Sequence, residues 1–288
     1  MKTVSIYVPC YNGEKHIARC LEALLTLDYP TDDIMLIDDG STDSTALIAQ
    51  RYPRVRLIRQ ATNKGLAAAR NLGLRSARHD LVASVDADVI ASKNWLTELV
   101  RVAEKLPNAS GYGGRLIESV TCGWGNRWRG EHLRQDWGDK RIVRPPFLFG
   151  SNMLMRREPI LAIGGYDERM RTNGEDVNLA YRLSQAGHYL VFDPAPVCYH
   201  LRKDSVGSVM RMHWRWMRHP WIILFPPQNM PELLAFLCKR IWRPCRDAAD
   251  RDWQNKNWRL LVLSLWLYAD HTWREVQAYL GRDKTPAS

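Results

Sequence analysis

Two carboxylates separated by one residue, Asp86 and Asp88, are the side chains of this 288-residue sequence best suited to do chemistry. They follow residues 81–85, an apolar run typical of a β-strand. Side chains at positions i and i+2 of a strand project from the same face, so both carboxylates can approach one cation. Mg²⁺ takes one or two carboxylates and completes its shell with water and substrate phosphates. The pair therefore predicts a divalent-metal site, although paired acids at a strand end can also be a solvated edge.

Three more apolar runs come earlier in the chain, at residues 3–9, 33–37 and 54–58. The segments that follow them have helical spacing, at residues 14–27, 44–52 and 66–77. Strands that alternate with helices through short connections predict a parallel sheet with crossover helices. In open sheets of this kind, the ligand lies outside the carboxyl ends of the strands. The acidic and turn-forming motifs occur at those ends.

A second polar cluster, Asp38 and Asp39, follows the second of these runs. A carboxylate at this place can accept hydrogen bonds from a ribose hydroxyl or a base N–H group. The alternative is helix capping by Ser41 or Asp43, and the two roles are compatible. Arg70, on the third predicted helix, could face a nucleotide, although an arginine on a helix is often just solvated.

An acid pair, Glu175 and Asp176, opens a predicted helix in the second half of the chain. The helix dipole favours acids at this position, so the pair could serve only as a cap. The same dipole would keep a general base ionised at neutral pH. Further on, His200 follows a short predicted strand at residues 189–192. It is a candidate metal ligand or phosphate contact, and the alternative is a structural histidine.

Composition narrows the class of protein. The hydrophobic content of 45% is ordinary for a globular protein. The six cysteines form no CxxC pair, so neither a zinc site nor a disulfide framework is predicted, and a reducing cytoplasm fits. No leader sequence is recognisable after Met1. The longest apolar stretches, residues 221–225 and 260–268, are shorter than the roughly 20 residues that span a bilayer.

Positive charge and tryptophan are concentrated at the end of the chain. Residues 201–288 hold 15 basic and 8 acidic side chains, whereas residues 1–110 hold 14 and 13. The string at residues 211–218 alternates cations with large apolar groups, and residues 221–225 follow as an apolar wedge. This pattern suits an anionic membrane surface. The alternative is a helical appendage whose tryptophans pack on the catalytic domain, and no recognised motif supports nucleic-acid binding.

In sequence order, the motifs resemble those of the inverting nucleotide-sugar glycosyltransferases with the GT-A fold. They are VPCYNGE, DDGSTD, NKGLAAARN, DAD, GSNML, GGYDE, NGEDVNLAYRL and YH. The resemblance covers about residues 3–203. It implies an α/β domain at residues 1–203, with a Rossmann-like, mainly parallel mixed sheet flanked by helices. Residues 204–288 would form a basic, Trp-rich and mainly helical extension.

The resemblance also implies roles for individual residues. The nucleobase and ribose would be surrounded by Pro9, Tyr11, Asp38, Asp39 and Arg70. Asn152 would also contact the donor, and Asp86 would approach the ribose or the metal. Asp88 would bind the Mn²⁺ or Mg²⁺ ion that bridges the diphosphate, and His200 would complete the metal shell. Asp176 would be the catalytic base, with Glu175 beside it.

The implied function is metal-dependent, inverting transfer of one sugar from a nucleotide-sugar donor to a glycan or polyprenyl-linked acceptor. Residues 204–288 would contact the membrane peripherally, at its cytoplasmic face. Processive members carry a QxxRW motif and spanning helices. The nearest string here, residues 212–216, begins with Met, so a non-processive hexosyltransferase is expected. The Gly- and Trp-rich residues 121–137 would be an acceptor or donor lid, or an ordinary surface loop.

The sequence is also compatible with other classes of protein. A nucleotidyltransferase should show a Gly/Arg/Lys-rich phosphate loop near its first strand, which residues 9–14 do not resemble. A catalytically inactive nucleotide-sugar-binding relative would lack the metal acid or the base, whereas Asp88 and Asp176 are both present. A retaining transferase would have the same fold, because fold alone does not set stereochemistry.

Overall fold

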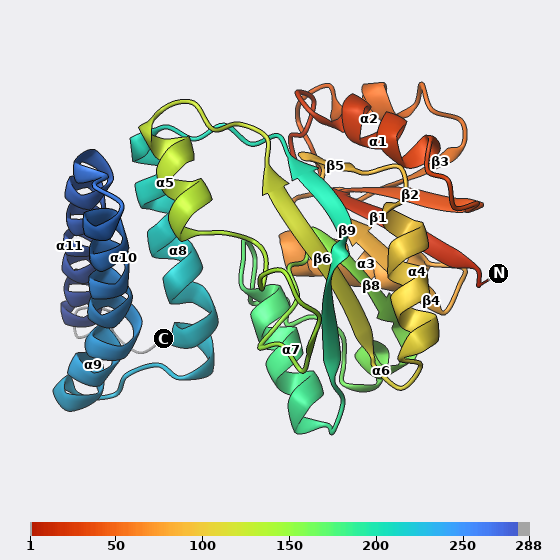
Figure 1. The fold of residues 1–288 in the computed structure, drawn as a ribbon. Helices are drawn as coiled ribbons and strands as arrows, with labels where there is room; N and C mark the ends of the chain where they lie inside the picture. The colour runs from red at the N-terminus through yellow and green to blue at the C-terminus, as the bar shows by residue number, and fades with distance from the viewer. Residues whose placement is uncertain (1, 282–288) are drawn as a thin grey trace. The chain divides into compact units, whose positions relative to one another are not determined.

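The computed structural model describes residues 2–281, except for the side chains of residues 219–224 (Figure 1). The chain divides into two compact units, and each is described by itself. The first unit comprises Met1–Val120 and Gln135–Arg202, and the second comprises Thr121–Arg134 and Lys203–Ser288. The division expected from the sequence, at 203/204, kept residues 121–134 in the first unit. The structure places them in the second, because α5 (Trp124–His132) packs on helices of that unit.

A mixed sheet forms the centre of the first unit. Its strands are β1 (Val4–Cys10), β2 (Asp33–Asp38), β3 (Val55–Arg59), β4 (Leu81–Val85), β5 (Val89–Ala91), β6 (Gly111–Glu118), β7 (Ile142–Val143), β8 (Asn152–Arg156) and β9 (Leu190–His200). They lie in the order β3-β2-β1-β4-β8-β6-β9-β5, and β7 pairs with β9. The first four strands are parallel, and β8 runs antiparallel to both of its neighbours. The predicted fold class is confirmed.

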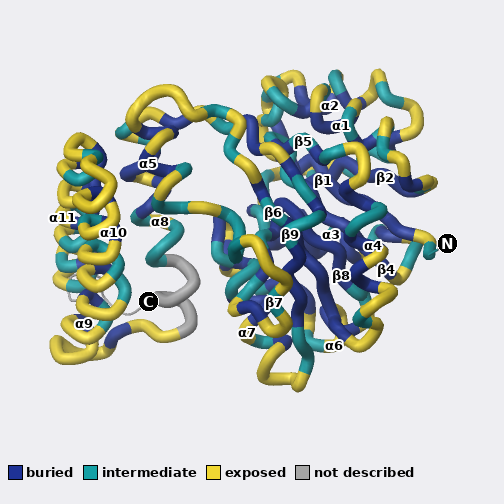
Figure 2. The backbone as a smooth tube through the Cα atoms, viewed as in Figure 1, coloured by how far each residue is buried: buried dark blue, intermediate teal, exposed yellow. Residues whose placement is uncertain are grey.

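Helices flank this sheet: α1 (Ile17–Leu25), α2 (Thr45–Ala49), α3 (Leu66–Ser76), α4 (Trp95–Lys105), α6 (Arg157–Ala162) and α7 (Glu175–Gln185). The predicted spacing in α1 is correct, because Ile17, Leu21 and Leu24 are all buried in the core. Figure 2 shows the buried strands beneath these partly exposed helices. The helices therefore cover the sheet, and the polar motifs lie at the ends of its strands.

The last strand, β9, is longer than the sequence predicts. The predicted strand covers only residues 189–192. Pro194 and Pro196 follow it, and proline cannot donate to a ladder. The structure continues β9 to His200 by a register shift against β6, between Gly113 and Arg115. The prolines lie at this irregularity, where the regular pairing is interrupted. The continuation carries His200 to the strand end beside β5.

Hydrogen bonds between two loops hold the ends of β1 and β2 together. Asn12 has the left-handed φ of 52°, which asparagine tolerates better than most residues. Its N–H donates to Ser41 Oγ at 2.9 Å, and its Oδ1 accepts from Thr42 N at 2.9 Å. Gly13 N donates to Thr45 Oγ1 at 2.8 Å. The turn-forming residues that follow each strand thus fix the loops against each other.

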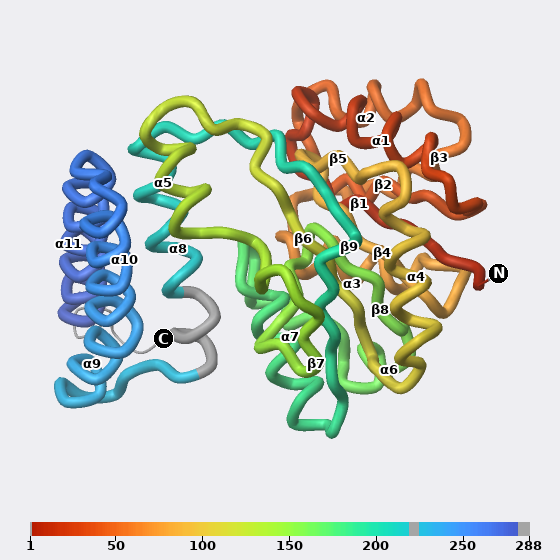
Figure 3. Tube along the Cα trace, in the orientation of Figure 1, coloured from red at the N-terminus to blue at the C-terminus, as the bar shows by residue number. Residues whose placement is uncertain are grey.

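The second unit is a helical bundle: α5, α8 (Val206–Leu224), α9 (Met230–Leu237), the π-helical turn η1 (Cys238–Trp242), α10 (Arg243–Gln254) and α11 (Trp258–Leu280). Trp128 is fully buried in its core and donates from Nε1 to Ser264 Oγ at 2.8 Å. Asp252 accepts from Ser264 and from His132, at 2.7 and 2.9 Å. Figure 3 follows the chain through these helices. Among the helices of residues 2–281, none has the length and hydropathy to cross a bilayer.

The basic and aromatic string at residues 211–218 is only partly packed inside this bundle. Met212 and His213 are fully buried, and Trp214 donates to Glu275 Oε1 at 3.0 Å. Arg218 forms an ion pair with the same carboxylate, at 2.9 Å. Arg211 and Arg215 of the string are exposed, so its cations and its apolar members have different surroundings. The apolar wedge at 221–225 lies outside the described side chains, except for the exposed Phe225.

At the opposite ends of the strands, one buried carboxylate connects several segments. Asp33 is fully buried, and its Oδ2 accepts from Ser5 Oγ at 2.6 Å and from Arg78 N at 2.9 Å. Its Oδ1 pairs with the half-buried Arg56. Burial alone would raise the pKa of Asp33, but these partners outweigh it and lower the pKa.

We expect Asp33→Ala to lower the free energy of unfolding by about 1–3 kcal/mol, because buried donors lose their acceptor. The wild-type carboxylate has a lowered pKa, so its contribution is present above the usual carboxyl pKa and is lost as the pH falls. Urea unfolding at pH 7 and at about pH 2 measures both effects. The control is Asp32→Ala, whose side chain is 72% exposed. Equal stability of the two variants would contradict this role for Asp33.

Candidate functional site

The predicted site residues lie around the carboxyl ends of the first unit's strands. Asp38 ends β2, and Asp86 and Asp88 follow β4. Glu175 and Asp176 open α7, after Gly174, which adopts the left-handed φ of 84°. These segments are far apart in the sequence, and hydrogen bonds to Arg70 join several of them.

Arg70 is the centre of the site. Its side chain is only 1% exposed. Nε donates to Glu175 Oε1 at 3.0 Å, and Nη2 donates to Asp86 Oδ1 at 2.9 Å. Nη1 donates to Ser84 Oγ at 2.6 Å and to the Gly150 carbonyl at 3.0 Å. Arg70 is predicted beside the nucleobase and ribose, and in the structure it is bonded to the chain's own carboxylates.

The two acids at the start of α7 have different surroundings. Glu175 is buried and paired with Arg70, and burial raises its pKa to about 7, against the opposing effect of Arg70. Asp176 is only partly buried, and its Oδ2 accepts from Gly150 N at 3.2 Å. Burial also raises the pKa of Asp176, while the Gly150 N–H group opposes the rise. Asp176 is thus a partly exposed carboxylate with an elevated proton affinity, as a general base needs.

Asp88 and His200 form the second polar centre of the site. His200 Nε2 lies 3.2 Å from Asp88 Oδ2, and Nδ1 lies 3.2 Å from Glu118 Oε1. Burial would lower the pKa of His200, but the two carboxylates outweigh it and raise the pKa to about 9. Burial alone would raise the pKa of Asp88, but His200 and Arg202 outweigh it and lower the pKa. Asp88 therefore stays ionised.

These residues fit a hard divalent cation that completes its shell from a ligand. The side chains of Asp86 and Asp88 are 34% and 33% exposed, so each keeps an accessible carboxylate. Glu118 on Nδ1 orients the His200 ring and leaves Nε2 directed at Asp88, as in carboxylate–histidine–metal arrangements. Within the described residues, no group of three or more ligating side chains is gathered for a metal. Such a site needs phosphate or water oxygens as well.

Asp38 and Asp39 are held by protein groups. Asp38 is buried, accepts from Ser41 N at 2.9 Å and pairs with Arg59 Nε at 3.0 Å. Asp39 accepts from the backbone N–H groups of residues 64 and 65, each at 2.8 Å. Asp39 therefore fixes the loop before α3, which carries Arg70.

The remaining predicted donor contacts are placed differently. Pro9 is buried within β1, whereas the Tyr11 ring is 50% exposed just after that strand. Asn152 is fully buried: its Oδ1 accepts from Trp95 Nε1 at 2.7 Å, and its Nδ2 donates to the Arg115 carbonyl at 2.8 Å. The structure thus shows Asn152 connecting strands and α4, and Tyr11 as the accessible member of the set.

Three participants were missed by the sequence analysis. Ser84 and Gly150 bind Arg70, and Glu118 binds His200. A Cβ atom at position 150 would lie 2.6 Å from Arg70 Nη2, so only glycine allows this close approach. The position of Glu118 could have been noticed in the sequence. It is the last residue of β6 (residues 111–118), just as Asp38 is the last residue of β2.

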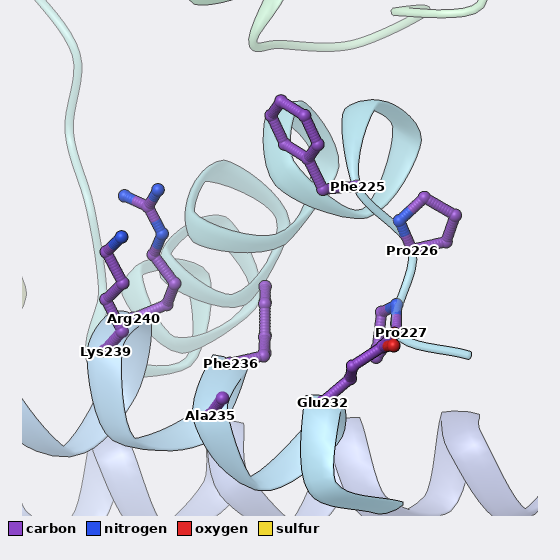
Figure 4. A pocket seen from close by; sticks show the side chains of 8 residues that line it. All are labelled: Phe225, Pro226, Pro227, Glu232, Ala235, Phe236, Lys239 and Arg240. Carbon is purple, nitrogen blue, oxygen red and sulfur yellow. The ribbon is translucent and has the colours of Figure 1, made fainter. Parts of the chain in front are cut away.

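A cavity of about 550 Å³ lies in the second unit and contains none of the predicted site residues. Its lining includes Phe225 and Phe236, together with the cations Lys239 and Arg240 (Figure 4). The lining offers neither the paired carboxylates nor the histidine on which the predicted chemistry depends. The predicted donor contacts therefore all belong to the first unit.

Comparison with known proteins supports the family resemblance. The model described as Glycosyl transferase family 2 matches residues 5–164, and the model described as Glycosyl transferase family 21 matches residues 139–238. EpsE of Bacillus subtilis, a glycosyltransferase by name, is 30% identical over 210 residues, which are 70% of this chain and 73% of EpsE. Four other curated relatives are longer, and the chain spans 50–54% of their length.

Two further comparisons extend this likeness. The N-acetylglucosaminyl-diphospho-decaprenol L-rhamnosyltransferase of Mycobacterium tuberculosis is 28% identical over 242 residues, covering 70% of this chain and 77% of that protein. The mannosyltransferase PcManGT of Pyrobaculum calidifontis, solved with GDP-Man and Mn²⁺, has a TM-score of 0.60 at 18% identity. The match covers 95% of this chain and 86% of that one. At this identity, the structural likeness establishes the fold alone.

We expect Arg70→Met to cost about 3–5 kcal/mol of the free energy of unfolding, because it leaves a buried carboxylate unpaired. Glu175→Gln should be costly alone but should add little to Arg70→Met. Urea unfolding of both single variants and the double variant measures this coupling, and Arg75→Met, on the exposed side of the same helix, is the control. Additivity within about 0.5 kcal/mol would show that Arg70 and Glu175 are not coupled.

Proposed function

The chain belongs to glycosyl transferase family 2, and from that premise we propose that it transfers a single sugar from a nucleotide-diphosphate sugar to an acceptor hydroxyl, with inversion at the anomeric carbon. The observation that supports this best is the pair of carboxylates opening α7. Glu175 is neutralised by Arg70, and Asp176 is left partly exposed beside the same guanidinium. Arg70 also binds Asp86 and the Gly150 carbonyl, and the Gly150 N–H group binds Asp176, so Asp176 and Asp86 are connected through Arg70 and Gly150.

In the proposed mechanism, Asp176 takes the proton of the attacking hydroxyl. Because the pKa of Asp176 is raised, it lies closer to neutral pH, and the carboxylate is a stronger base for the hydroxyl proton. Gly150 N–H holds Oδ2 of this carboxylate in place. Direct attack from the face opposite the leaving diphosphate inverts the anomeric centre. Glu175 positions Arg70 and does not itself need to exchange a proton.

The donor's diphosphate would lie near Asp86, Asp88 and His200. These side chains would hold Mn²⁺ or Mg²⁺, and that ion would neutralise charge on the departing diphosphate. Asp88 keeps its charge because His200 and Arg202 lower its pKa against the effect of burial. Tyr11, exposed just after β1, is proposed to contact the nucleobase, and Asp38 and Asp39 to shape the ribose pocket from behind.

The acceptor is proposed to be a glycan or a polyprenyl-linked sugar in polysaccharide biosynthesis. The name of the rhamnosyltransferase relative, which acts on a diphospho-decaprenol, supports the lipid-linked alternative. Residues 204–288 would contact the membrane peripherally. We propose the cytoplasmic face as the location, since the six cysteines are free, as a reducing compartment leaves them. The chain has both Asp88 and Asp176. Their presence favours an active enzyme over a catalytically inactive nucleotide-sugar-binding relative.

The donor and its metal can be tested together by thermal shift. A panel of UDP-, dTDP- and GDP-sugars with Mn²⁺ or Mg²⁺ should include one donor that stabilises the protein by about 2.7 kcal/mol at a hundredfold excess over Kd. We expect EDTA or Asp88→Ala to reduce this stabilisation and abolish transfer. Asp80→Ala, at the other end of β4, is the control. Full transfer by the wild-type protein in EDTA would refute the proposed metal dependence.

We expect Asp176→Asn to lower kcat by about 10²-fold or more while donor binding persists, because the amide cannot accept the proton. The base acts when deprotonated, so wild-type kcat should fall as the pH drops through a pKa above the usual carboxyl value of about 3.9. This fall in kcat at low pH reports the apparent pKa of Glu175 and Asp176 together, because the two carboxyl groups interact. The fall should be absent in Asp176→Asn. A larger loss in Glu175→Gln than in Asp176→Asn would move the base to Glu175.

A further inference from the structure

The last helix, α11, is apolar on two opposite faces. Its inner face is buried in the core of the second unit, through residues that include Leu260, Leu263 and Leu267. Its outer face carries six large apolar side chains, each more than half exposed: Trp258, Val262, Leu265, Trp266, Trp273 and Leu280. We call these six residues the outer stripe. Apart from the adjacent pair Leu265 and Trp266, successive members are three, four or seven residues apart, which places them on one side of the helix.

The charged residues of α11 leave most of the outer stripe uninterrupted, and the exposed Arg259 lies beside its first member, Trp258. Asp270 and Arg274 bond to each other at 2.7 Å, and Glu275 is buried against Trp214 and Arg218. A surface helix normally carries polar residues on its outer face, and a helix that is apolar all round is normally covered. An exposed apolar stripe of this length therefore marks an interaction surface.

We propose that the outer stripe rests on the surface of an anionic lipid bilayer, with α11 lying parallel to the membrane plane. Three of its six members are Trp, which prefers the membrane interface. Trp253, 60% exposed, packs on Trp258 with ring centroids 4.7 Å apart and widens the stripe at one end. A helix of 23 residues lying in the interface offers a contact about 35 Å long.

Charge favours a bilayer over a second copy of this chain. The residues of the second unit include 17 basic and 9 acidic side chains, a net charge of +8. Two such units that met through their stripes would repel each other, whereas anionic lipid headgroups would be attracted. Arg259 and Arg127 both lie over the Trp124 ring, at 5.0 and 5.3 Å. They place two cations beside the end of the stripe that begins at Trp258.

This inference rests on the proposed function and deepens it, because a polyprenyl-linked acceptor resides in a membrane. The surface would hold the enzyme where such an acceptor is found. The stripe itself contacts neither donor nor acceptor sugar in this proposal. Its role is to concentrate the enzyme at the membrane.

Vesicle co-sedimentation tests the proposal with the full chain. We expect the wild-type protein to bind vesicles of phosphatidylcholine mixed with phosphatidylglycerol, and to bind less as salt rises, since exposed charges are screened. Val262→Ser combined with Leu265→Ser should lower the partition coefficient about tenfold or more. The matched control is Leu47→Ser combined with Val143→Ser, whose side chains are 65% and 51% exposed in the first unit. The control should bind like the wild type.

Two outcomes would overturn the proposal. One is wild-type protein that stays in the supernatant with both phosphatidylcholine and mixed vesicles. The other is a dimer, detected by light scattering without lipid, that the Val262→Ser and Leu265→Ser substitutions convert to a monomer. The second outcome would identify another copy of the chain as the occupant of the stripe.

Donor-induced thermal shift without vesicles separates this inference from the proposed function. The Val262→Ser and Leu265→Ser variant should keep the full shift and lose vesicle binding. Asp88→Ala should lose most of the shift and keep vesicle binding. Loss of only one property in each variant distinguishes failure of the membrane surface from failure of the donor site.

Discussion

The buried guanidinium of Arg70 is the interaction on which the rest of the site depends. An unpaired charge at this depth would be prohibitively costly, so the surrounding chain must supply compensating groups. It supplies four acceptors, from β4 and its following loop, from the segment before β8 and from α7. Each bond ties a separate part of the sequence to α3. The position of the carboxylates around the site follows from the need to satisfy this one cation.

That constraint gives neighbouring acids different roles. Glu175 and Asp176 are adjacent in sequence, yet Glu175 is buried against Arg70 and Asp176 is partly exposed. Asp86 and Asp88 differ in their partners rather than in their exposure, since Asp86 bonds to Arg70 and Asp88 to His200. In each pair, the two carboxylates have distinct surroundings. Pairs of titratable groups with distinct surroundings are typical of catalytic sites.

The sequence predicts the parallel half of the fold because apolar runs and helical spacing are local properties. It also predicts which strand ends carry acids. It could not predict the burial of Arg70, because the partner Glu175 lies 105 residues away and an isolated helical arginine is usually solvated. The burial of Asn152 could not be predicted for a similar reason, since its partners come from α4 and β6. The prolines of β9 are tolerated only because β6 shifts register, which no local pattern reveals.

The two units also differ in how their charge is distributed. The net charge of +10 divides into +8 for the second unit and +2 for the first, although the first is proposed to bind the diphosphate. A nearly neutral first unit is compatible with this proposal, because a few local groups and a divalent ion would balance a bound phosphate. That local balance does not require the excess charge of the second unit. A long-range positive field beside exposed tryptophans is suited to an extended anionic surface, where many weak attractions add together.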